Sequence, residues 1–483
     1  MIEDLDFRPW PGAAQPGLQP RAAAGARRSS YQLTFAVLTT GVASYALLQS
    51  LVIPLLSTIQ AELHTSQDAA TWVLTAYLLS ASVATPILAR AGDIYGKKRV
   101  LVGTLAALAT GSVVAASSVN ITMMITGRVI QGLAGGILPV GFGIIRDEFP
   151  AGKVAGAVGM LAAQVAVGSG LGIVLAGPVV HLLGWRWLFW LLTTVTVLAG
   201  IGAALFIPES RVRSPGAISW LPALLLTGTL VALLLPLSKA SDWGWDATST
   251  VGLFEAAAAL AAAWVWAELR ARVPLIDMRM MRQPAVWTNN AVSLMMGTGM
   301  YAMYAFLPEF VQTPSAAGYG FTASITRSGL MLLPMAATMF MAGLFAGRLT
   351  QVFGGKALVV AGSVVGAAAL AALAFAHAQQ WQVYLATAVM GIGCGLAYPA
   401  VSALIVSAVP PDQTGVASGM NANIRSIGGS IGTAIMASTV TSQLEASGLP
   451  KQAGYTAGFA MMGAALLLAA VAGLFIPAQR RAA

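Results

Sequence analysis

Charged side chains that interrupt long apolar stretches are the first candidates for chemistry in this sequence. Arg128 and Arg425 each lie inside an apolar run, and Glu309 lies near the end of another. A charge at such a place is costly to bury and is usually kept for a function. For Arg128 we favour a functional role over an arginine that only clamps helices through backbone carbonyls. Glu309 is the one credible proton carrier, with Arg327 as its candidate partner, and a solvated acid at the end of the run is the equal alternative.

A short charged loop, residues 89–99, lies between two of the apolar runs. Glycine permits the tight turn that joins two helices. A carboxylate fixed near a helix N-terminus gains ~0.3–1 kcal/mol from the helix dipole. The loop therefore predicts a specific polar contact at the membrane face rather than an ordinary solvated turn. The residues that we expect to act there are Gly92, Asp93, Gly96, Lys97, Lys98 and Arg99.

The composition places these residues in a membrane protein. The chain has 483 residues, of which 57% are hydrophobic and 9% charged, and its mean hydropathy is +0.77. Soluble domains carry about 25% charged residues. The single cysteine, Cys394, and three scattered histidines predict neither a disulfide framework nor a metal site. The sequence also lacks the G-x-x-x-x-G-K-[ST] phosphate-binding motif, so we expect no cofactor, no ATP hydrolysis and no other enzyme activity.

Fourteen apolar runs are long enough to cross a bilayer as helices, since each crossing needs about 20 residues. The fold class that we predict is therefore an all-α polytopic membrane protein. The predicted spans are 34–57, 70–89, 99–119, 122–145, 154–177, 185–207, 217–237, 250–268, 286–310, 328–350, 357–377, 382–408, 415–440 and 455–477.

Cations concentrate in the loops on one side of these spans and in both tails, whereas the opposite loops offer mainly Lys239 and Lys451. By the positive-inside rule both termini are cytoplasmic. The same one-sided pattern accounts for the excess of 26 Lys and Arg over 17 Asp and Glu without a nucleic-acid partner. The cation-rich loops contain Arg90, Lys97, Lys98, Arg99, Arg146, Lys153, Arg211, Arg213, Arg270, Arg272, Arg279, Arg282, Arg348 and Lys356.

A weaker copy of the charged loop follows the tenth span. Gly347-Arg348 and Gly354-Gly355-Lys356 repeat its glycines and cations but not its acid. Parallel six-span repeats are one way in which transporters are built. We therefore expect a six-helix bundle over 31–208, an inserted pair of helices with linkers over 209–284 and a second six-helix bundle over 285–478. Residues 1–30 are predicted to form a disordered cytoplasmic tail, and residues 479–483 a second cytoplasmic tail.

Three motifs carry a resemblance to the major facilitator superfamily. The charged loop matches the G-D-x-x-G-[RK]-[RK] pattern of that family, and residues 128–132 match R-x-x-Q-G. The stretch 421–429 resembles N-x-x-R-x-x-G-G. A glycine-rich fifth span followed by Trp185-Arg186-Trp187 is similar to the branch of fourteen-helix drug/proton antiporters. The resemblance covers nearly the whole chain from residue 34 onward.

Two positions depart from the antiporter pattern. Ile173 stands where the antiporter signature has a proline, and Tyr45 stands where the first span usually carries an aspartate. Glu255 and Glu268 lie in the inserted pair, where we expect their side chains to snorkel toward the surface. These departures favour a facilitator, whereas the fourteen spans and the motifs favour proton-coupled export.

The resemblance implies a major facilitator fold, with two six-helix halves plus two inserted helices, that works by alternating access. It also implies that the charged loop forms an inner gate in which Asp93 latches the start of the thirteenth span, residues 410–415. Arg128 is implied to be the proton-coupling residue. Polar residues in span interiors complete the predicted substrate cavity: Gln49, Tyr77, Gln131, Gln164, Asn289, Asn290, Tyr301, Tyr304, Tyr398, Asn421 and Arg425.

The function that we predict is proton-coupled efflux of small hydrophobic compounds across the inner or plasma membrane. The alternative is a facilitator, importer or exporter of a dedicated endogenous metabolite without proton antiport. Because arginines outnumber acids in the spans, we expect neutral or anionic substrates. The expected partners are a small-molecule substrate, the proton and the lipid bilayer, and we expect a monomer.

Overall fold

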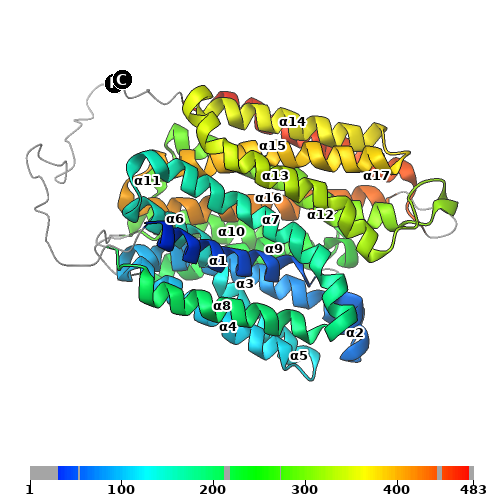
Figure 1. Ribbon diagram of the computed structural model, residues 1–483, viewed down its shortest axis with the longest axis horizontal. Coiled ribbons are helices and arrows are strands. Elements are labelled where there is room, and N and C mark those ends of the chain that lie inside the picture. The colour runs from blue at the N-terminus through cyan, green and yellow to red at the C-terminus, as the bar shows by residue number, and fades with distance from the viewer. Residues whose placement is uncertain (1–30, 53–54, 211–217, 272–273, 443–448, 478–483) are drawn as a thin grey trace, which may run out of the picture.

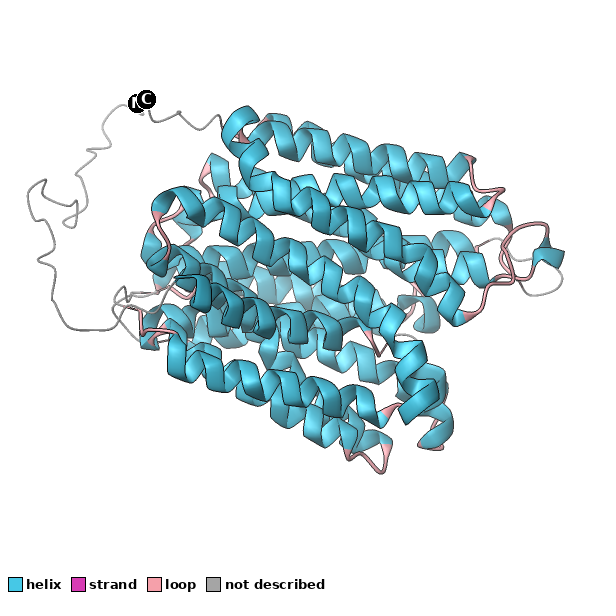
Figure 2. Cartoon of the chain, viewed as in Figure 1, coloured by secondary structure: helices cyan, strands magenta, loops and turns pink. Residues whose placement is uncertain are grey.

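The computed structural model describes residues 31–52, 55–210, 218–271, 274–442 and 449–477, and these residues are predominantly helical (Figures 1 and 2). The all-α fold class is therefore confirmed. The predicted tails and the loop cations Arg211, Arg213 and Arg272 lie outside the described residues.

Each of the fourteen predicted spans overlaps a helical segment of the described residues. The first group of helices comprises α1 (Tyr31–Ser50), the short α2 (Leu56–Glu62), α3 (Gln67–Tyr95), α4 (Lys97–Ala116), α5 (Ile121–Gly132), the 3-10 turn η2 (Leu133–Gly136), α6 (Ile137–Glu148), α7 (Ala151–Leu183) and α8 (Arg186–Phe206). The segment α5–η2–α6 corresponds to the fourth predicted span.

The remaining elements follow in the same order as the predicted spans. A middle pair comprises α9 (Trp220–Trp243) and α10 (Thr248–Arg270), followed by the short α11 (Met278–Met281). The second group comprises α12 (Pro284–Gln312), η3 (Ser315–Ala317), α13 (Ile325–Phe353), α14 (Gly355–Phe375), α15 (Gln380–Ala408), η4 (Pro411–Gln413), α16 (Thr414–Thr441) and α17 (Gln452–Leu474).

Among the described residues, eleven segments are long and apolar enough to cross a membrane. The segments α12 and α16 have the length but not the apolarity, because polar side chains such as Asn289, Asn290, Asn421 and Arg425 interrupt them. Within α7, Gly152–Val165 is a shorter apolar stretch. The polar character of α12 and α16 agrees with their position inside the bundle, where both bury these residues.

Local sequence determines where several helices begin. Ser66 Oγ accepts a hydrogen bond from Ala69 N before α3, and Asn120 Oδ1 accepts one from Met123 N before α5. Ser324 Oγ accepts one from Arg327 N before α13. Such side chains satisfy N–H groups that the first turn leaves without a partner.

Small residues hold the two groups together. α7 packs against α13 and α15 of the second group, and Figure 1 shows α7 between α1 and α13. A Cβ added at Gly347 of α13 would lie 2.9 Å from the Cα of Gly156 of α7, and one added at Gly343 of α13 would lie 2.6 Å from Ala163 Cβ of α7. Glycine therefore permits a helix contact that larger residues would prevent.

The middle pair, α9 and α10, packs on itself and reaches both groups, since α9 contacts α3 and α16. The expectation that Glu268 snorkels is wrong. Its side chain is buried and accepts hydrogen bonds from Trp264 Nε1, Leu275 N and Ile276 N. The chain after α10 folds back over the carboxylate, so Glu268 fixes this connection. Glu255 is exposed.

The two related charged loops have the same backbone construction. Gly96 joins α3 to α4 with φ of 113°, and Gly354 joins α13 to α14 with φ of 85°. Positive φ at these values is strained for residues other than glycine. The turn after α13 thus repeats the turn after α3.

Candidate functional site

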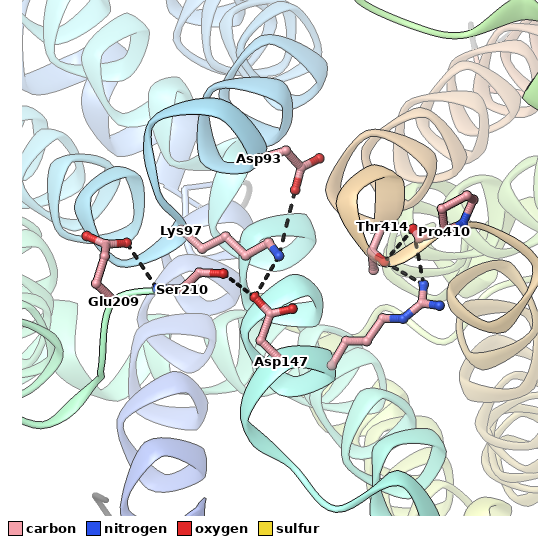
Figure 3. A network of polar contacts seen from close by, with 8 residues as sticks. Asp93, Lys97, Asp147, Glu209, Ser210, Pro410 and Thr414 are labelled. Atoms are coloured by element: carbon pink, nitrogen blue, oxygen red, sulfur yellow. Dashed lines mark hydrogen bonds and ion pairs between the residues drawn. The ribbon is translucent and has the colours of Figure 1, made fainter. Parts of the chain in front are cut away.

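The charged loop forms a buried ion-pair network at one end of the bundle, which we call the gate end (Figure 3). Lys97 Nζ lies 2.7 Å from Asp147 Oδ2 on α6 and 4.0 Å from Asp93 Oδ1 on α3. All three side chains are almost fully buried. Gly143 makes room for the lysine, because a Cβ there would lie 2.8 Å from Lys97 Cε.

Asp93 faces the second group across the gate end. A Cβ added at Gly415, in the first turn of α16, would lie 3.0 Å from Asp93 Oδ2. Lys97, Arg90 and the backbone N–H of Val416 all act on this carboxylate, and neither carboxylate oxygen has a hydrogen bond of good geometry. The positive end of the α16 dipole favours a carboxylate here. The structure thus brings Asp93 to the chain segment 410–415.

Arg146 makes a second polar contact between the groups at this end. Its Nη1 donates to Thr414 Oγ1 at 2.6 Å and to the carbonyl oxygens of Val406 and Pro410. Sequence reasoning assigned Arg146 only to membrane topology and did not single out Asp147. The adjacent opposite charges of Arg146 and Asp147 at the end of an apolar run were the sequence signal that could have indicated a role in this contact. α3 and α6 both contact the start of α16, so the two helix groups meet at the gate end.

The remaining loop residues lie at the rim of the network. Arg99 Nε is 3.4 Å from Glu209 Oε2, and the arginine side chain is 70% exposed. A Cβ at Gly96 would collide with the Glu209 carboxylate, and Gly92 packs against Val140. Exposed pairs of this kind contribute about 0–1 kcal/mol. Lys98 forms no ion pair among the described residues.

Arg128 is fully buried in the first group. Its Nε donates to Val73 O at 3.1 Å, and its Nη1 donates to Leu48 O at 3.3 Å and to Gln131 Oε1 at 2.7 Å. The guanidinium carbon lies 4.2 Å from the centre of the Tyr77 ring, and Nη2 has no hydrogen-bond partner. Arg128 therefore ties α1, α3 and α5 together and keeps one donor free beside Tyr77.

A narrow cavity lies between the two groups. Its volume is about 40 Å³, which is enough for a few water molecules but far below the ~300–1,000 Å³ of a small-molecule site. Of the predicted cavity residues it is lined by Gln49, Tyr77, Tyr301 and Arg425. Its polar lining also includes residues that we did not assign to the cavity: Tyr45, Ser82, Thr85, Asn423 and Ser426.

The cavity contains one cation and no carboxylate among its described lining residues. The guanidinium of Arg425 lies 4.3 Å from the centre of the Tyr398 ring, which stacks behind it. Asn423 Nδ2 donates to Ser82 O at 2.7 Å and so joins α16 to α3 beside the cavity. Tyr45 lines the cavity at the position where the antiporter pattern has an acid. The site is thus aromatic and positively charged.

Other residues predicted to line the cavity lie elsewhere. Gln131 is held by Arg128 and Ser112, Gln164 donates to Thr39 O, and Asn421 donates to Asn290 Oδ1 and Ser293 Oγ. These contacts lie within one helix group. The predicted residues outside the cavity lining are Gln131, Gln164, Asn289, Asn290, Tyr304, Tyr398 and Asn421.

Glu309 lies near the end of α12 that is remote from the gate end, and its side chain is exposed. The carboxylate faces the hydroxyl group of Tyr455 on α17. The expected partner Arg327 instead donates to Gln380 Oε1 at 2.8 Å. Glu309 is therefore placed beside a tyrosine, and the pairing with Arg327 is wrong.

Comparison with known proteins identifies the fold of this chain. A sequence model of the Major Facilitator Superfamily matches residues 38–433 and 313–483. The crystal structure of the human organic anion transporter MFSD10 (TETRAN) superposes with a TM-score of 0.65 at 16% identity, covering 92% of this chain and 99% of that chain. The same helical fold is thus present in both.

Several bacterial proteins are similar in sequence. A tetracenomycin C resistance and export protein of Streptomyces glaucescens is 27% identical, over 89% of this chain and 79% of the relative. A multidrug resistance protein B homolog of Mycobacterium tuberculosis is 29% identical, over 81% of this chain and 72% of the relative. An uncharacterized MFS-type transporter of M. tuberculosis is also 29% identical, and the match spans 83% of this chain but only 58% of that relative's length.

Proposed function

Because the chain belongs to the major facilitator superfamily, we propose that this membrane transporter, which is not an enzyme, exports small hydrophobic compounds by alternating access. The cavity between the two helix groups carries this proposal. It lies where a substrate path between two rocking bundles is expected, and it is closed at the gate end by Asp93 and Arg146. Its volume of about 40 Å³ requires the groups to separate before a substrate enters.

We place the gate end at the cytoplasmic face. The cation-rich loops gather there, with Lys97, Arg99 and Arg146 in the gate itself. The bacterial relatives support a plasma-membrane location. The positive-inside rule supports cytoplasmic termini. In this orientation the described conformer is closed to the cytoplasm, and a substrate reaches the cavity after the gate end opens.

The side chains that line the cavity suit neutral or anionic aromatic substrates once the groups separate. Tyr45, Tyr77 and Tyr301 provide aromatic surface and hydroxyl groups, and Arg425 provides the positive charge. A dication would require membrane-embedded acids, which the described lining lacks. Relatives named for tetracenomycin C resistance and export, for multidrug resistance and as a probable actinorhodin transporter support the export of small compounds.

We further propose that export is coupled to protons through Arg128 and Glu309. Arg128 keeps an unpaired Nη2 beside Tyr77, and Glu309 is an acid near the remote end of α12. A second candidate function is facilitated diffusion without protons. The absence of a carboxylate from the described cavity lining, with Tyr45 in the place of the usual acid, favours that candidate.

Proton release from proteoliposomes separates the two candidates. Purified protein is reconstituted, and a panel of neutral, anionic and cationic lipophiles is added while internal pH and substrate uptake are followed. Proton movement that follows substrate in the wild type and disappears in Glu309→Gln supports antiport. The control Glu255→Gln changes an exposed acid of α10 and should behave as the wild type. Substrate movement without proton movement supports the facilitator, and no movement of any compound overturns both.

A further inference from the structure

A crevice opens to the outside of the bundle at the gate end, between the first turns of α1 and α7 and the last turns of α13. Its volume is about 380 Å³, much larger than that of the central cavity. Phe35, Phe149 and Met160 line it from the first group, and Leu344 lines it from the second. Since α7 lies between α1 and α13 (Figure 1), the crevice follows the interface of the two groups.

Two cations from opposite groups face this crevice. Lys153, near the start of α7, donates from Nζ to Tyr31 Oη at 2.6 Å and lies 4.6 Å from the centre of that ring. Arg348, near the end of α13, is exposed on the other side. No carboxylate lines the crevice among the described residues. An anion placed here would contact both helix groups at once.

The crevice occupies the place that corresponds to the Asp93 contact. At the gate, a Cβ at Gly415 of α16 would lie 3.1 Å from Ala89 O of α3, and at the crevice Gly347 of α13 meets Gly156 of α7. Ala89 and Gly347 precede the positive-φ glycines, Gly96 and Gly354, by the same number of residues.

The same alignment places Gln351 where Asp93 stands. Gln351 lines the crevice, so this junction has an amide where the other junction has a buried carboxylate. Arg348 likewise corresponds to Arg90. One junction between the groups therefore contains its own anion, and the corresponding junction offers cations without one.

We propose that this crevice binds an anionic phospholipid of the cytoplasmic leaflet, with the phosphate between Lys153 and Arg348 and part of an acyl chain along Phe35, Met160 and Leu344. The leaflet assignment rests on the orientation given under the proposed function. Cations at a membrane face attract anionic headgroups, and the apolar, outward-open lining suits a lipid better than a hydrated ion. The bound lipid joins α7 to α13 as Asp93 joins α3 to α16.

Lipid titration of the purified full-length protein in neutral detergent tests the site. Native mass spectrometry compares dioctanoyl phosphatidylglycerol, dioctanoyl phosphatidylcholine and inorganic phosphate. The wild type should bind phosphatidylglycerol at least about tenfold more tightly than phosphatidylcholine, since two cations contribute. The Lys153→Gln/Arg348→Gln variant should lose this preference. Lys356→Gln removes a cation of the same loop that does not line the crevice and should keep it.

The variant Gln351→Glu provides the opposite test. It supplies the acid found at the corresponding position Asp93, so it should lose the preference for phosphatidylglycerol and raise the thermal midpoint measured without added lipid. The proposal would be overturned if the wild type bound both lipids equally, or if the double variant kept the preference for phosphatidylglycerol. It would also be overturned if inorganic phosphate bound as tightly as phosphatidylglycerol. Lipid selectivity in a protein that moves no compound would overturn the proposed function alone, and export without lipid selectivity would overturn only this site.

Discussion

Lys97 and Asp147 form an ion pair of 2.7 Å whose side chains are only 1% and 6% exposed. The lysine begins α4 and the aspartate lies in the last turn of α6, so the pair joins two helix ends of the first group. Asp93, from α3, lies on the other side of the same ammonium group. The buried ammonium group of Lys97 thus lies between two acids, and Arg90 also acts on Asp93.

Replacing Lys97 by methionine should destabilise the protein strongly. Methionine fills a similar volume but leaves Asp93 and Asp147 without their cation, and removing one partner of a buried pair typically costs about 3–5 kcal/mol. Thermal unfolding in detergent, monitored as the loss of monodisperse protein with temperature, measures this change in stability.

Lys98→Met is the matched control for this substitution. Lys98 is the next residue, is only partly buried and joins no ion pair among the described residues, so its replacement should change stability by less than about 0.5 kcal/mol. Equal effects of the two substitutions would contradict a network centred on Lys97.

Loss of Arg146 should open the gate end. Arg146 donates to Thr414 Oγ1 at 2.6 Å across the interface, and a charged hydrogen bond contributes about 1.5–3 kcal/mol. In Arg146→Gln, a cysteine at Ser426 in the cavity lining should react roughly tenfold faster with a membrane-impermeant thiol reagent applied from the gate end. The background variant is Cys394→Ala, which removes the single native cysteine.

Arg99→Gln serves as the control for this labelling experiment. Arg99 belongs to the same loop, but its ion pair with Glu209 is exposed and does not connect the two groups. Its replacement should leave the labelling rate unchanged. If both variants label at the wild-type rate, Arg146 does not hold the gate end closed.

The helix positions could be predicted because a bilayer demands long apolar segments, and the described helices overlap the predicted spans. The side of each helix that faces the other group could not be predicted. These helices are apolar on most sides and carry only a few polar residues, so the sequence pattern does not mark one inward face. For this reason Tyr304 and Asn289 were assigned to a cavity that Tyr45 and Asn423 line instead.

Contacts between residues that are distant in the sequence could not be predicted either. Asp147 follows Arg146 at the end of an apolar run, where charged residues are common in ordinary loops. Only the fold brings its carboxylate to Lys97. The prediction that Glu268 snorkels was wrong for a related reason. The residues that cover its carboxylate, Leu275 and Ile276, follow its helix in the sequence. The family motif around Asp93 predicted a contact with residues 410–415, and its carboxylate lies beside Gly415.

Gly428 should tolerate no side chain. A Cβ there would collide with the carbonyl oxygen of Leu294, so Gly428→Ala forces α16 away from α12. Such overpacking costs about 1–3 kcal/mol or more. The control is Gly103→Ala on α4, where an added Cβ meets nothing within 4 Å and the helix should gain up to about 1 kcal/mol. Thermal midpoints that fall for both variants, or for neither, would contradict the close contact of α12 and α16.

Arg425 should select for anionic substrates. It is the only cation in the described lining of the central cavity, and the Tyr398 ring holds its guanidinium group from behind. For a transported polycyclic aromatic acid and its methyl ester, Arg425→Gln should weaken binding of the acid by about tenfold, because one charged contact contributes about 1.5 kcal/mol. The ester should change by less than about threefold, because it makes no charged contact.

Tryptophan fluorescence titration of purified protein measures both dissociation constants for this comparison. Asn421→Ala is the control, since Asn421 lies on the same helix but donates to Asn290 and Ser293 away from the cavity lining. It should leave the ratio of the two constants unchanged even where it lowers stability. A ratio that shifts equally in both variants would mean that the altered packing of α16, rather than the charge of Arg425, sets the preference. A ratio unchanged in Arg425→Gln would mean that acids bind without contacting this guanidinium.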